Sequence, residues 1–292
     1  MTAARLTSGF YVAAVSAILV AFALSWRTPM GAQPRLDISW TLGSLPTQPA
    51  PIPIERPSTA NARAPVAAAP APPPPERAQV ARVEERLKDN LTQELYDNFG
   101  LFLYVSKAAS GPWAQQMYVF RKEANGDFTL LYRWPVSTGR ERIETDAAGR
   151  RVSTHTPAGY YELDPHRLYR RHFSSEWHQP MPYAMFFNWT HRGRLTGLAI
   201  HSATGRDVAA LGKRASAGCI HLSPDAARTL YTLIRTKYRG TVPRFAVNRA
   251  GTMSNEGIVL HDLHGRLKTA PGYRVLVLIE NYDERNLIAA MY

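Results

Sequence analysis

The stretch of sequence that decides both the fold and the chemistry is GLAIHSATGRDVAALGKRASAGCIHL, residues 197–222. It opens on an apolar, strand-like run that ends at His201, and fourteen residues separate this histidine from Ser216. A short loop then contains Cys219, and Ser-Pro-Asp at 223–225 has the order of an N-cap, a proline at the first helical position and an acid in the first turn. The pattern predicts a strand, a loop that carries the cysteine, and a helix.

Cys219 and His201 are the residues from which a chemistry can be argued. A thiolate is a nucleophile that a nearby imidazolium or a helix N-terminus stabilises, and a histidine distant in sequence can lie beside it as its base. Gly218 lets the backbone approach a substrate carbonyl closely, and the amides of Gly218 and Cys219 are candidate donors to an oxyanion. The alternative interpretation is a buried, inert cysteine that packs as a small hydrophobe.

The sequence around this stretch predicts a mainly β domain of the α+β class with a few helices. Short runs rich in aromatic and β-branched residues are separated by Gly, Pro and Asn, which is typical of strands joined by turns. These runs lie at residues 101–106, 116–120, 128–136, 160–163, 195–200 and 273–280. The absence of βαβ alternation and of a Gly-rich phosphate loop argues against a nucleotide-binding α/β fold.

Three segments precede this domain. Residues 10–26 form an uncharged apolar run after a single arginine, so residues 1–27 are predicted to be a signal peptide or an N-terminal membrane anchor. Residues 28–78 are rich in Pro and Ala, a composition that predicts a disordered linker. Apolar residues at three- and four-residue spacing predict a helix over 79–97 that packs on the domain at 98–282, with a tail at 283–292.

Net charge limits the classes of binding partner, and cysteine content limits the covalent and metal sites that the chain can form. The chain has 35 Lys and Arg against 23 Asp and Glu, a net charge of +12, and a basic surface attracts polyanions. An export signal and the lack of a basic motif interleaved with aromatics argue against nucleic acid and favour an anionic polymer of the cell envelope. One cysteine excludes an intramolecular disulfide and a four-cysteine zinc site.

The order of motifs resembles that of the YkuD-type L,D-transpeptidases. The signature of that family is a histidine, fourteen to seventeen residues, Ser or Thr, His or Arg, Gly, Cys, an aliphatic residue, and Asn or Arg, and residues 201–221 follow it closely. The resemblance covers about residues 98–233 and the closing strand at 273–280. Three further elements agree in order, namely Pro135-Val136-Ser137-Thr138-Gly139, Thr156-Pro157-Ala158-Gly159-Tyr160-Tyr161, and Pro182-Tyr183-Ala184-Met185 before the run that ends at His201.

The resemblance implies a YkuD-like β-sandwich and a role for each residue of the signature. Cys219 would form a thioester with a peptidoglycan stem peptide and pass it to an amine, with His201 as the general base. The carbonyl of Ser202 would hold the second ring nitrogen of His201. Neither a metal nor an organic cofactor is implied. Gly218 and Ser216 would support the oxyanion and the site, and Tyr183, Met185 and His221 would bind substrate.

Two positions depart from the signature. Ala217 stands where the family has His or Arg, and His221 stands where it has Asn or Arg. A histidine there replaces a permanent charge by one that titrates near neutrality, so His221 is expected either to bind a substrate carboxylate at low pH or to point into the protein. Residues 240–268 are interpreted as an insertion before the last strand.

Other functions stay open at the level of sequence. Water in place of the amine would make the same acyl-enzyme an L,D-carboxypeptidase or endopeptidase. Zinc could be bound by Cys219, His221 and His201, or by His261 and His264. A degenerate enzyme would be a non-catalytic wall-binding protein. In each case the predicted location is the periplasm or cell envelope, with a tether to the inner membrane through residues 10–26 and envelope proteins as further amine acceptors.

Overall fold

The computed structural model of the chain describes residues 74–146 and 148–282. The chain divides into two compact units, Met1–Arg63 and Ala64–Tyr292, and every described residue belongs to the second. The predictions for residues 1–27, including the apolar run 10–26, for most of the linker and for the tail lie outside the described residues. No helix in the described part of the chain is long and apolar enough to cross a membrane.

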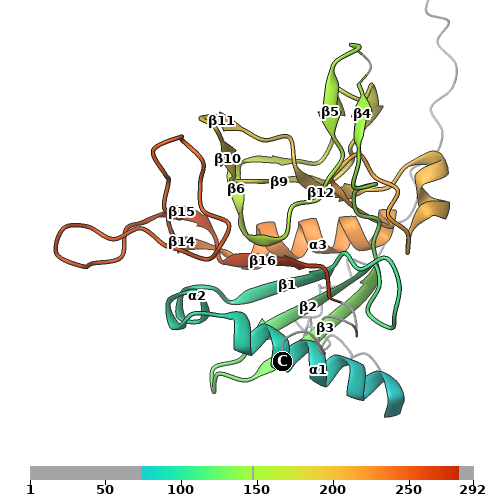
Figure 1. Cartoon of the computed structure of the whole chain (residues 1–292). Helices are drawn as coiled ribbons and strands as arrows, with labels where there is room; N and C mark the ends of the chain where they lie inside the picture. Colours follow the sequence, from blue (N-terminus) through green and yellow to red (C-terminus); the bar gives the residue numbers. More distant parts are fainter. Residues whose placement is uncertain (1–73, 147, 283–292) are drawn as a thin grey trace, which may run out of the picture. The chain divides into compact units, whose positions relative to one another are not determined.

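One mixed sheet of eight strands forms the framework (Figure 1). Strand β1 is parallel to β16, strand β12 is parallel to β13, and the other neighbours are antiparallel. The strands in order across the sheet are β13 (Ile220–Leu222), β12 (Ala199–Ser202), β9 (Ala184–Phe187), β6 (Gly159–Tyr169), β16 (Val275–Glu280), β1 (Leu101–Ser106), β2 (Gln116–Lys122) and β3 (Phe128–Pro135).

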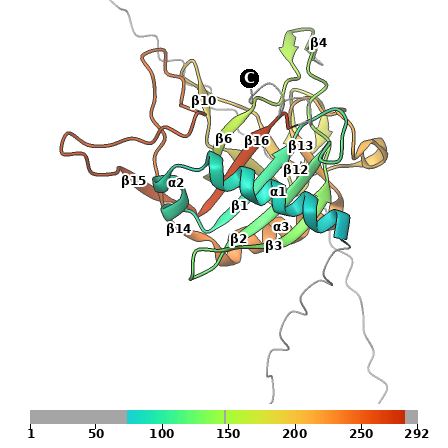
Figure 2. The same ribbon diagram turned by 60° about the horizontal axis from the view of Figure 1, so that its bottom comes forward.

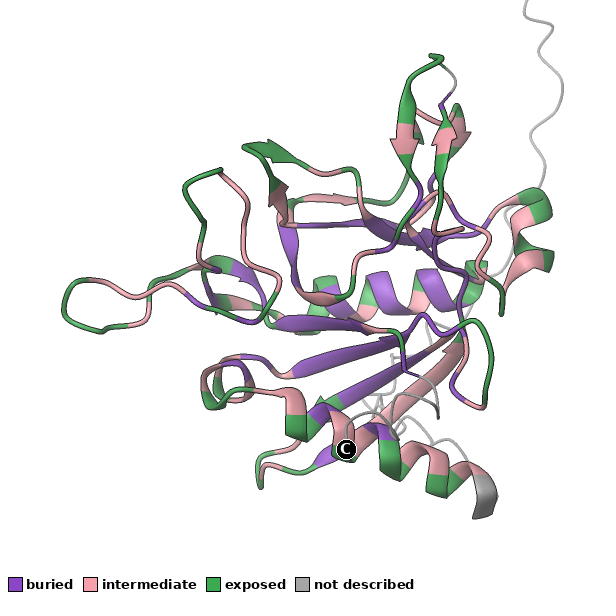
Figure 3. Ribbon diagram, in the orientation of Figure 1, coloured by how far each residue is buried: buried purple, intermediate pink, exposed green. Residues whose placement is uncertain are grey.

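The central strands are covered on both faces, which explains why β1 is a continuous apolar run. All six residues of β1 are buried (Figure 3). Leu101, Leu103 and Val105 face a core that contains Leu230 and Ile234 of helix α3 (Pro224–Lys237) and side chains from both ends of the sheet. Figure 1 shows α3 between β6, β9 and β12 on one side and β1 to β3 on the other. The prediction of a mainly β sandwich with a few helices is confirmed.

The opposite face of the central strands is covered by helix α1 (Pro74–Asn90), which lies across β1 and β2 in Figure 2. Val83 and Leu87 are buried there against a second core that includes Phe102, Tyr118 and Leu276. The Arg86 guanidinium also lies 2.8 Å from the Glu280 carboxylate on β16. The helix therefore belongs to the same folded body as the sheet.

The helix predicted over 79–97 is in fact two helices. Helix α1 begins at Pro74, inside the segment interpreted as linker, and a second helix, α2 (Gln93–Asn98), follows it. The Thr92 side chain accepts a hydrogen bond from the Leu95 amide at 3.3 Å, so Thr92 is an N-cap that interrupts the apolar periodicity. Helix α3 begins as the sequence predicts, with the Ser223 hydroxyl accepting from the Ala226 amide at 3.2 Å.

The remaining elements are small. Strand β1 has the bounds that the sequence predicts. In the run expected to be a strand at 195–200, only residue 195 and residues 199–200 are in strands. Strand β9 was not predicted. In the segment interpreted as an insertion, residues 244–268 project between β14 and β15. The smaller hairpins are β4 (Ile143–Thr145) with β5 (Arg151–Ser153), β7 (Phe173–Ser174) with β8 (Gln179–Pro180), β10 (Thr190–His191) with β11 (Arg194–Leu195), and β14 (Arg239–Pro243) with β15 (Thr269–Tyr273); a 3-10 helix, η1, covers Gly205–Ala210.

We expect Leu87→Ala to lower the free energy of unfolding by about 2–5 kcal/mol, because it leaves a cavity under α1. The side chain is 1% exposed. Leu263→Ala is the matched control, since that leucine is fully exposed and its truncation leaves no cavity. Denaturant unfolding of both variants measures the difference. Equal stability of the two would mean that α1 does not pack on the sheet.

Candidate active site

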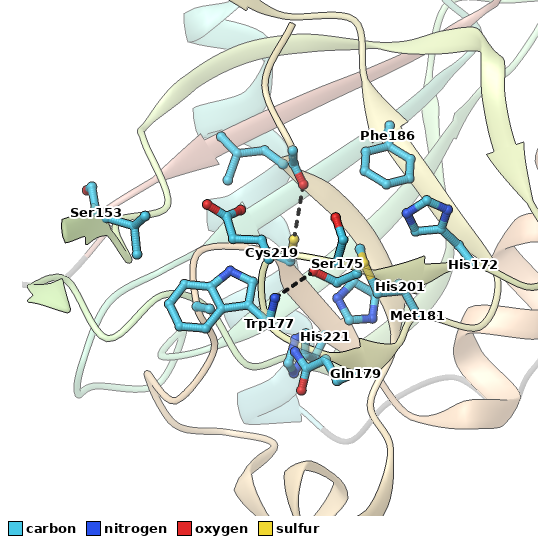
Figure 4. Close-up of a pocket in the computed structure, with 16 residues that line it drawn as sticks. Ser153, His172, Ser175, Trp177, Gln179, Met181, Phe186, His201, Cys219 and His221 are labelled. Carbon is cyan, nitrogen blue, oxygen red and sulfur yellow. Dashed lines mark hydrogen bonds between the residues drawn. The ribbon is translucent and has the colours of Figure 1, made fainter. Parts of the chain in front are cut away.

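The parallel pairing of β12 with β13 brings the candidate base and nucleophile together. His201 on β12 is the register partner of His221 on β13, and their ring centroids are 4.5 Å apart. Cys219 is the residue immediately before β13. All three side chains line one cavity of about 300 Å³, shown in Figure 4. Residues separated by a long loop in the sequence therefore meet at one edge of the sheet.

The ring of His201 is held in a defined orientation. Its Nδ1 lies 2.9 Å from the carbonyl oxygen of Ser202. Because a carbonyl only accepts hydrogen bonds, Nδ1 carries the proton of the neutral imidazole and donates it. Nε2 is then the unprotonated nitrogen and is the one able to accept a proton. The ring is 2% exposed, so its surroundings fix this arrangement.

The loop that carries Cys219 is held by Ser216. The Ser216 hydroxyl donates to the Cys219 carbonyl at 2.5 Å and accepts from the Gly218 amide at 3.0 Å. Gly218 has a φ of +119°, and a Cβ there would lie 3.1 Å from the His155 carbonyl oxygen. A side chain at this position would be strained in its backbone and crowded, so the turn before the cysteine requires glycine.

Two motifs distant in sequence hold the same loop from the other side. The Thr156 hydroxyl donates to the Gly218 carbonyl at 2.7 Å and accepts from the Gly139 amide at 2.8 Å. The Ser216 amide donates to the Thr138 carbonyl at 2.9 Å, next to the Gly139 position. Thr156 therefore joins the 135–139 motif, the 156–161 motif and the cysteine loop through a single hydroxyl group.

The hydrogen bonds change the expected oxyanion donors. The Gly218 amide, one of the two expected donors, is already bound to the Ser216 hydroxyl. Within residues 74–146 and 148–282, no acceptor binds the amide of Cys219 itself. The Cys219 amide is therefore the candidate oxyanion donor that remains free. Gly218 supports the site through its backbone conformation and not as a donor.

Burial leaves Cys219 and His201 uncharged at neutral pH. Desolvation, with a smaller contribution from the Glu176 charge, raises the pKa of the Cys219 thiol to about 11, although a hydrogen bond from the Ala199 amide acts to lower it. Desolvation and the neighbouring His221 lower the pKa of His201 to about 3. The free protein therefore holds a thiol and a neutral imidazole. The expected stabilisation of a thiolate by a charged histidine is not what the structure provides, because both groups lie in a water-poor cavity.

His221 also differs from its expected behaviour. Desolvation, together with the charge of Arg140, lowers the pKa of His221 to about 4. The ring lines the cavity and is 3% exposed, and its Nδ1 is 3.9 Å from the Asp207 carboxylate. His221 is uncharged at neutral pH, so the expectation that it titrates near neutrality is wrong for the free protein.

Tyr183 and Met185 do not line this cavity. Met185 is fully buried in the core that surrounds α3. Tyr183 packs edge-to-face on Tyr231 of α3, with ring centroids 5.6 Å apart, and lines a different pocket. The expectation that both side chains line a donor groove beside Cys219 is therefore wrong. On β9 the alternate residues Ala184 and Phe186 face the cysteine, and the sequence does not say which face of the strand does so.

Sequence reasoning missed the residues that close the cavity. They come from β5, from β9, and from the β7–β8 hairpin with the residues that flank it, and the two strands of this hairpin have two residues each. Strands of two residues show no hydrophobic periodicity in the sequence. The one sequence signal in this segment is Trp177, a large aromatic residue among polar ones. The missed lining residues are Val152, Ser153, His172, Ser174, Ser175, Glu176, Trp177, Gln179, Met181 and Phe186.

A metal site does not form from the candidate ligands in the described part of the chain, where no three His, Cys, Asp or Glu side chains are grouped as ligands. His261 is engaged by another group, because its Nε2 lies 2.5 Å from the Glu94 carboxylate on α2. His264 is exposed.

Comparison with known proteins gives the family. Residues 110–247 match the family model of YkuD, the L,D-transpeptidase catalytic domain. Residues 110–247 therefore correspond to a YkuD-type L,D-transpeptidase catalytic domain. Strands β1 and β16 lie outside the matched segment although they are at the centre of the sheet. No curated protein matches the chain.

Several solved structures are similar at low sequence identity. An L,D-transpeptidase from Stackebrandtia nassauensis is 19% identical, with a TM-score of 0.31, over 46% of this chain and 50% of that chain. The L,D-transpeptidase of Xylanimonas cellulosilytica is 15% identical over 68% and 69%, with a TM-score of 0.35. The helical cell shape determining protein Pgp2 of Campylobacter jejuni is 14% identical over 68% and 55%, also with a TM-score of 0.35. This chain thus spans about half of the Stackebrandtia protein.

We expect Thr156→Val to lower the free energy of unfolding by about 1–3 kcal/mol, because the Gly139 amide and the Gly218 carbonyl lose their buried partner. The cysteine loop loosens with it, so turnover falls as well. The matched control is Thr138→Val, since the buried Thr138 hydroxyl has no hydrogen-bond partner in the described structure. Thermal unfolding compares the pair, and an equal loss in both variants would contradict the role of Thr156.

The pKa of the Cys219 thiol predicts how its reactivity depends on pH. A thiol with a pKa of about 11 is alkylated by its small thiolate fraction, so the iodoacetamide rate rises about tenfold per pH unit from about pH 6 to pH 9 without a plateau. Mass spectrometry follows the reaction at the single cysteine, and Cys219→Ala is the blank. A plateau below neutral pH that His201→Ala removes would instead indicate a thiolate–imidazolium pair.

Proposed function

We propose that the protein is a peptidoglycan L,D-transpeptidase that forms a thioester on Cys219. The observation that carries this proposal is the orientation of His201. Its Nδ1 is anchored to the Ser202 carbonyl, and its ring lines the same cavity as Cys219. Nε2 is therefore the ring nitrogen that can accept the thiol proton, which in the free protein is donated to the Gly197 carbonyl oxygen, 3.5 Å from the sulfur. The match to the YkuD catalytic domain supports the assignment of the reaction class.

The acylation step follows from the neutral state of the pair. His201 Nε2 takes the thiol proton as the sulfur attacks the carbonyl carbon of the stem peptide, and the free Cys219 amide donates to the oxyanion that develops. When the intermediate collapses, the bond to the terminal D-alanine breaks and His201 returns the proton to the leaving nitrogen. The product is a thioester, and a neutral His201 is ready for the second step.

The second step transfers the acyl group to an amine of another stem peptide or of an envelope protein. The nitrogen attacks the thioester carbon, the carbon–sulfur bond breaks, and a proton reaches the sulfur through His201. If water attacks instead, the protein is an L,D-carboxypeptidase. No metal or organic cofactor takes part in either course.

The proposed place of action is the cell envelope. The substrate is wall material, and the net charge of +12 favours the approach to anionic envelope polymers. The export or anchoring segment at residues 10–26 stays a prediction from the sequence.

We expect full-length protein incubated with purified muropeptides to give products of defined mass, either a cross-linked dimer or a shortened stem. Cys219→Ala abolishes both products, and His201→Ala lowers the rate by about 10²–10⁴, the usual contribution of a positioned general base. His264→Ala, a change at an exposed histidine, is the control and keeps the rate. Activity retained in Cys219→Ala would exclude the thioester mechanism.

A further inference from the structure

A single formally charged side chain lines the catalytic cavity. This is Glu176, in the loop between β7 and β8; every other described residue that lines the cavity is neutral or is a histidine or the cysteine. Desolvation lowers the pKa of the lining histidines His172, His201 and His221, so all three are uncharged at neutral pH. Glu176 thus brings a negative charge to the lining, and the positive charge of Arg140 lies behind the lining, with its guanidinium 5.9 Å from the centroid of the Trp177 ring.

The fold does not use this carboxylate. Within residues 74–146 and 148–282, Glu176 accepts no hydrogen bond, and its one ion-pair partner is Arg150, 3.8 Å away. Arg150 is 65% exposed and is held more closely by Asp146, at 2.6 Å. The Glu176 side chain is itself 42% exposed, so a ligand can reach it from the cavity mouth.

The charge of Glu176 acts at the reacting sulfur. It contributes to the raised pKa of the Cys219 thiol, which places the carboxylate within electrostatic range of the nucleophile. Such a charge is a disadvantage for activating a thiol, because it disfavours the thiolate. The same charge attracts cations to the mouth of the cavity.

We infer that Glu176 binds the ammonium group of the acyl acceptor and so directs the Cys219 thioester toward aminolysis rather than hydrolysis. The inference rests on the proposed function and names the acceptor class, a primary amine that arrives protonated. A charge-assisted hydrogen bond to the carboxylate would hold it beside the thioester carbonyl.

The protons of the second step balance with this assignment. The bound ammonium first loses one proton to solvent and becomes nucleophilic. Its nitrogen attacks the thioester carbon, and the cationic nitrogen of the intermediate gives a second proton to the neutral Nε2 of His201. The carbon–sulfur bond then breaks as the amide forms, and His201 passes this proton to the sulfur. Glu176 stays ionised throughout and exchanges no proton.

The experiment measures how the acyl-enzyme of the full-length protein partitions between amine and water. The donor is a stem tetrapeptide, the acceptor is a stem tripeptide ending in diaminopimelate, and mass spectrometry counts cross-linked and hydrolysed products. Glu176→Gln removes the charge in the cavity. Glu256→Gln removes the same charge at an exposed position in the 244–268 segment and is the matched control. A parallel series uses hydroxylamine, an amine that is largely uncharged at neutral pH.

We expect Glu176→Gln to lower the ratio of cross-linked to hydrolysed product about tenfold with the tripeptide, the effect of losing one charge-assisted hydrogen bond. The ratio with hydroxylamine stays within about twofold of the Glu256→Gln control. The rate of acylation does not fall, because loss of the Glu176 charge removes one of the causes that raise the pKa of the Cys219 thiol. Equal ratios in the two variants, a larger loss of hydrolysis than of aminolysis, or hydrolysis alone in the wild type would each overturn the inference. Failure to acylate Cys219 would instead contradict the proposed function.

Discussion

The site depends on the parallel backbone pairing of β12 with β13. Parallel neighbours cannot be joined by a tight turn and need a crossover of a dozen or more residues. Residues 203–219 are that crossover, and this explains why fourteen residues separate His201 from Ser216. The pairing places His201 beside His221 and sets Cys219 at the entry of β13. A shift of one residue in this register would turn the histidine to the opposite face of the sheet.

Burial gives this site its chemical character. The cavity lies between a sheet edge and two short hairpins, and desolvation there outweighs the attraction between a thiolate and an imidazolium. The pair is therefore neutral at rest, and in the proposed mechanism it would separate charge only as the sulfur attacks. A free amide at Cys219 and an anchored ring at His201 would then already be in place, so that little reorganisation would be needed.

The framework around the site is larger than the segment that matches the family. Strands β1 and β16 pair in parallel at the middle of the sheet, and α1 covers their outer face. The chain from Pro74 onward thus contributes to one folded body. Segments that are distant in the sequence are also joined beside the cysteine loop, where the Thr156 hydroxyl connects three motifs by hydrogen bonds. These contacts hold the cysteine loop rigid enough to aim the sulfur.

The sequence by itself determined the β character, strand β1 and the start of α3, because composition, capping and motif spacing are local properties. It also singled out Cys219 and His201, which line one cavity in the structure. It also indicated the carbonyl of Ser202 as the partner of His201 through the family resemblance. Only the tertiary structure decided the rest. Which face of β9 meets the cysteine, which amide stays free and how far burial moves each pKa depend on contacts between residues far apart in the chain. For that reason Met185 was expected in the groove and lies in the core, and Glu176 was missed.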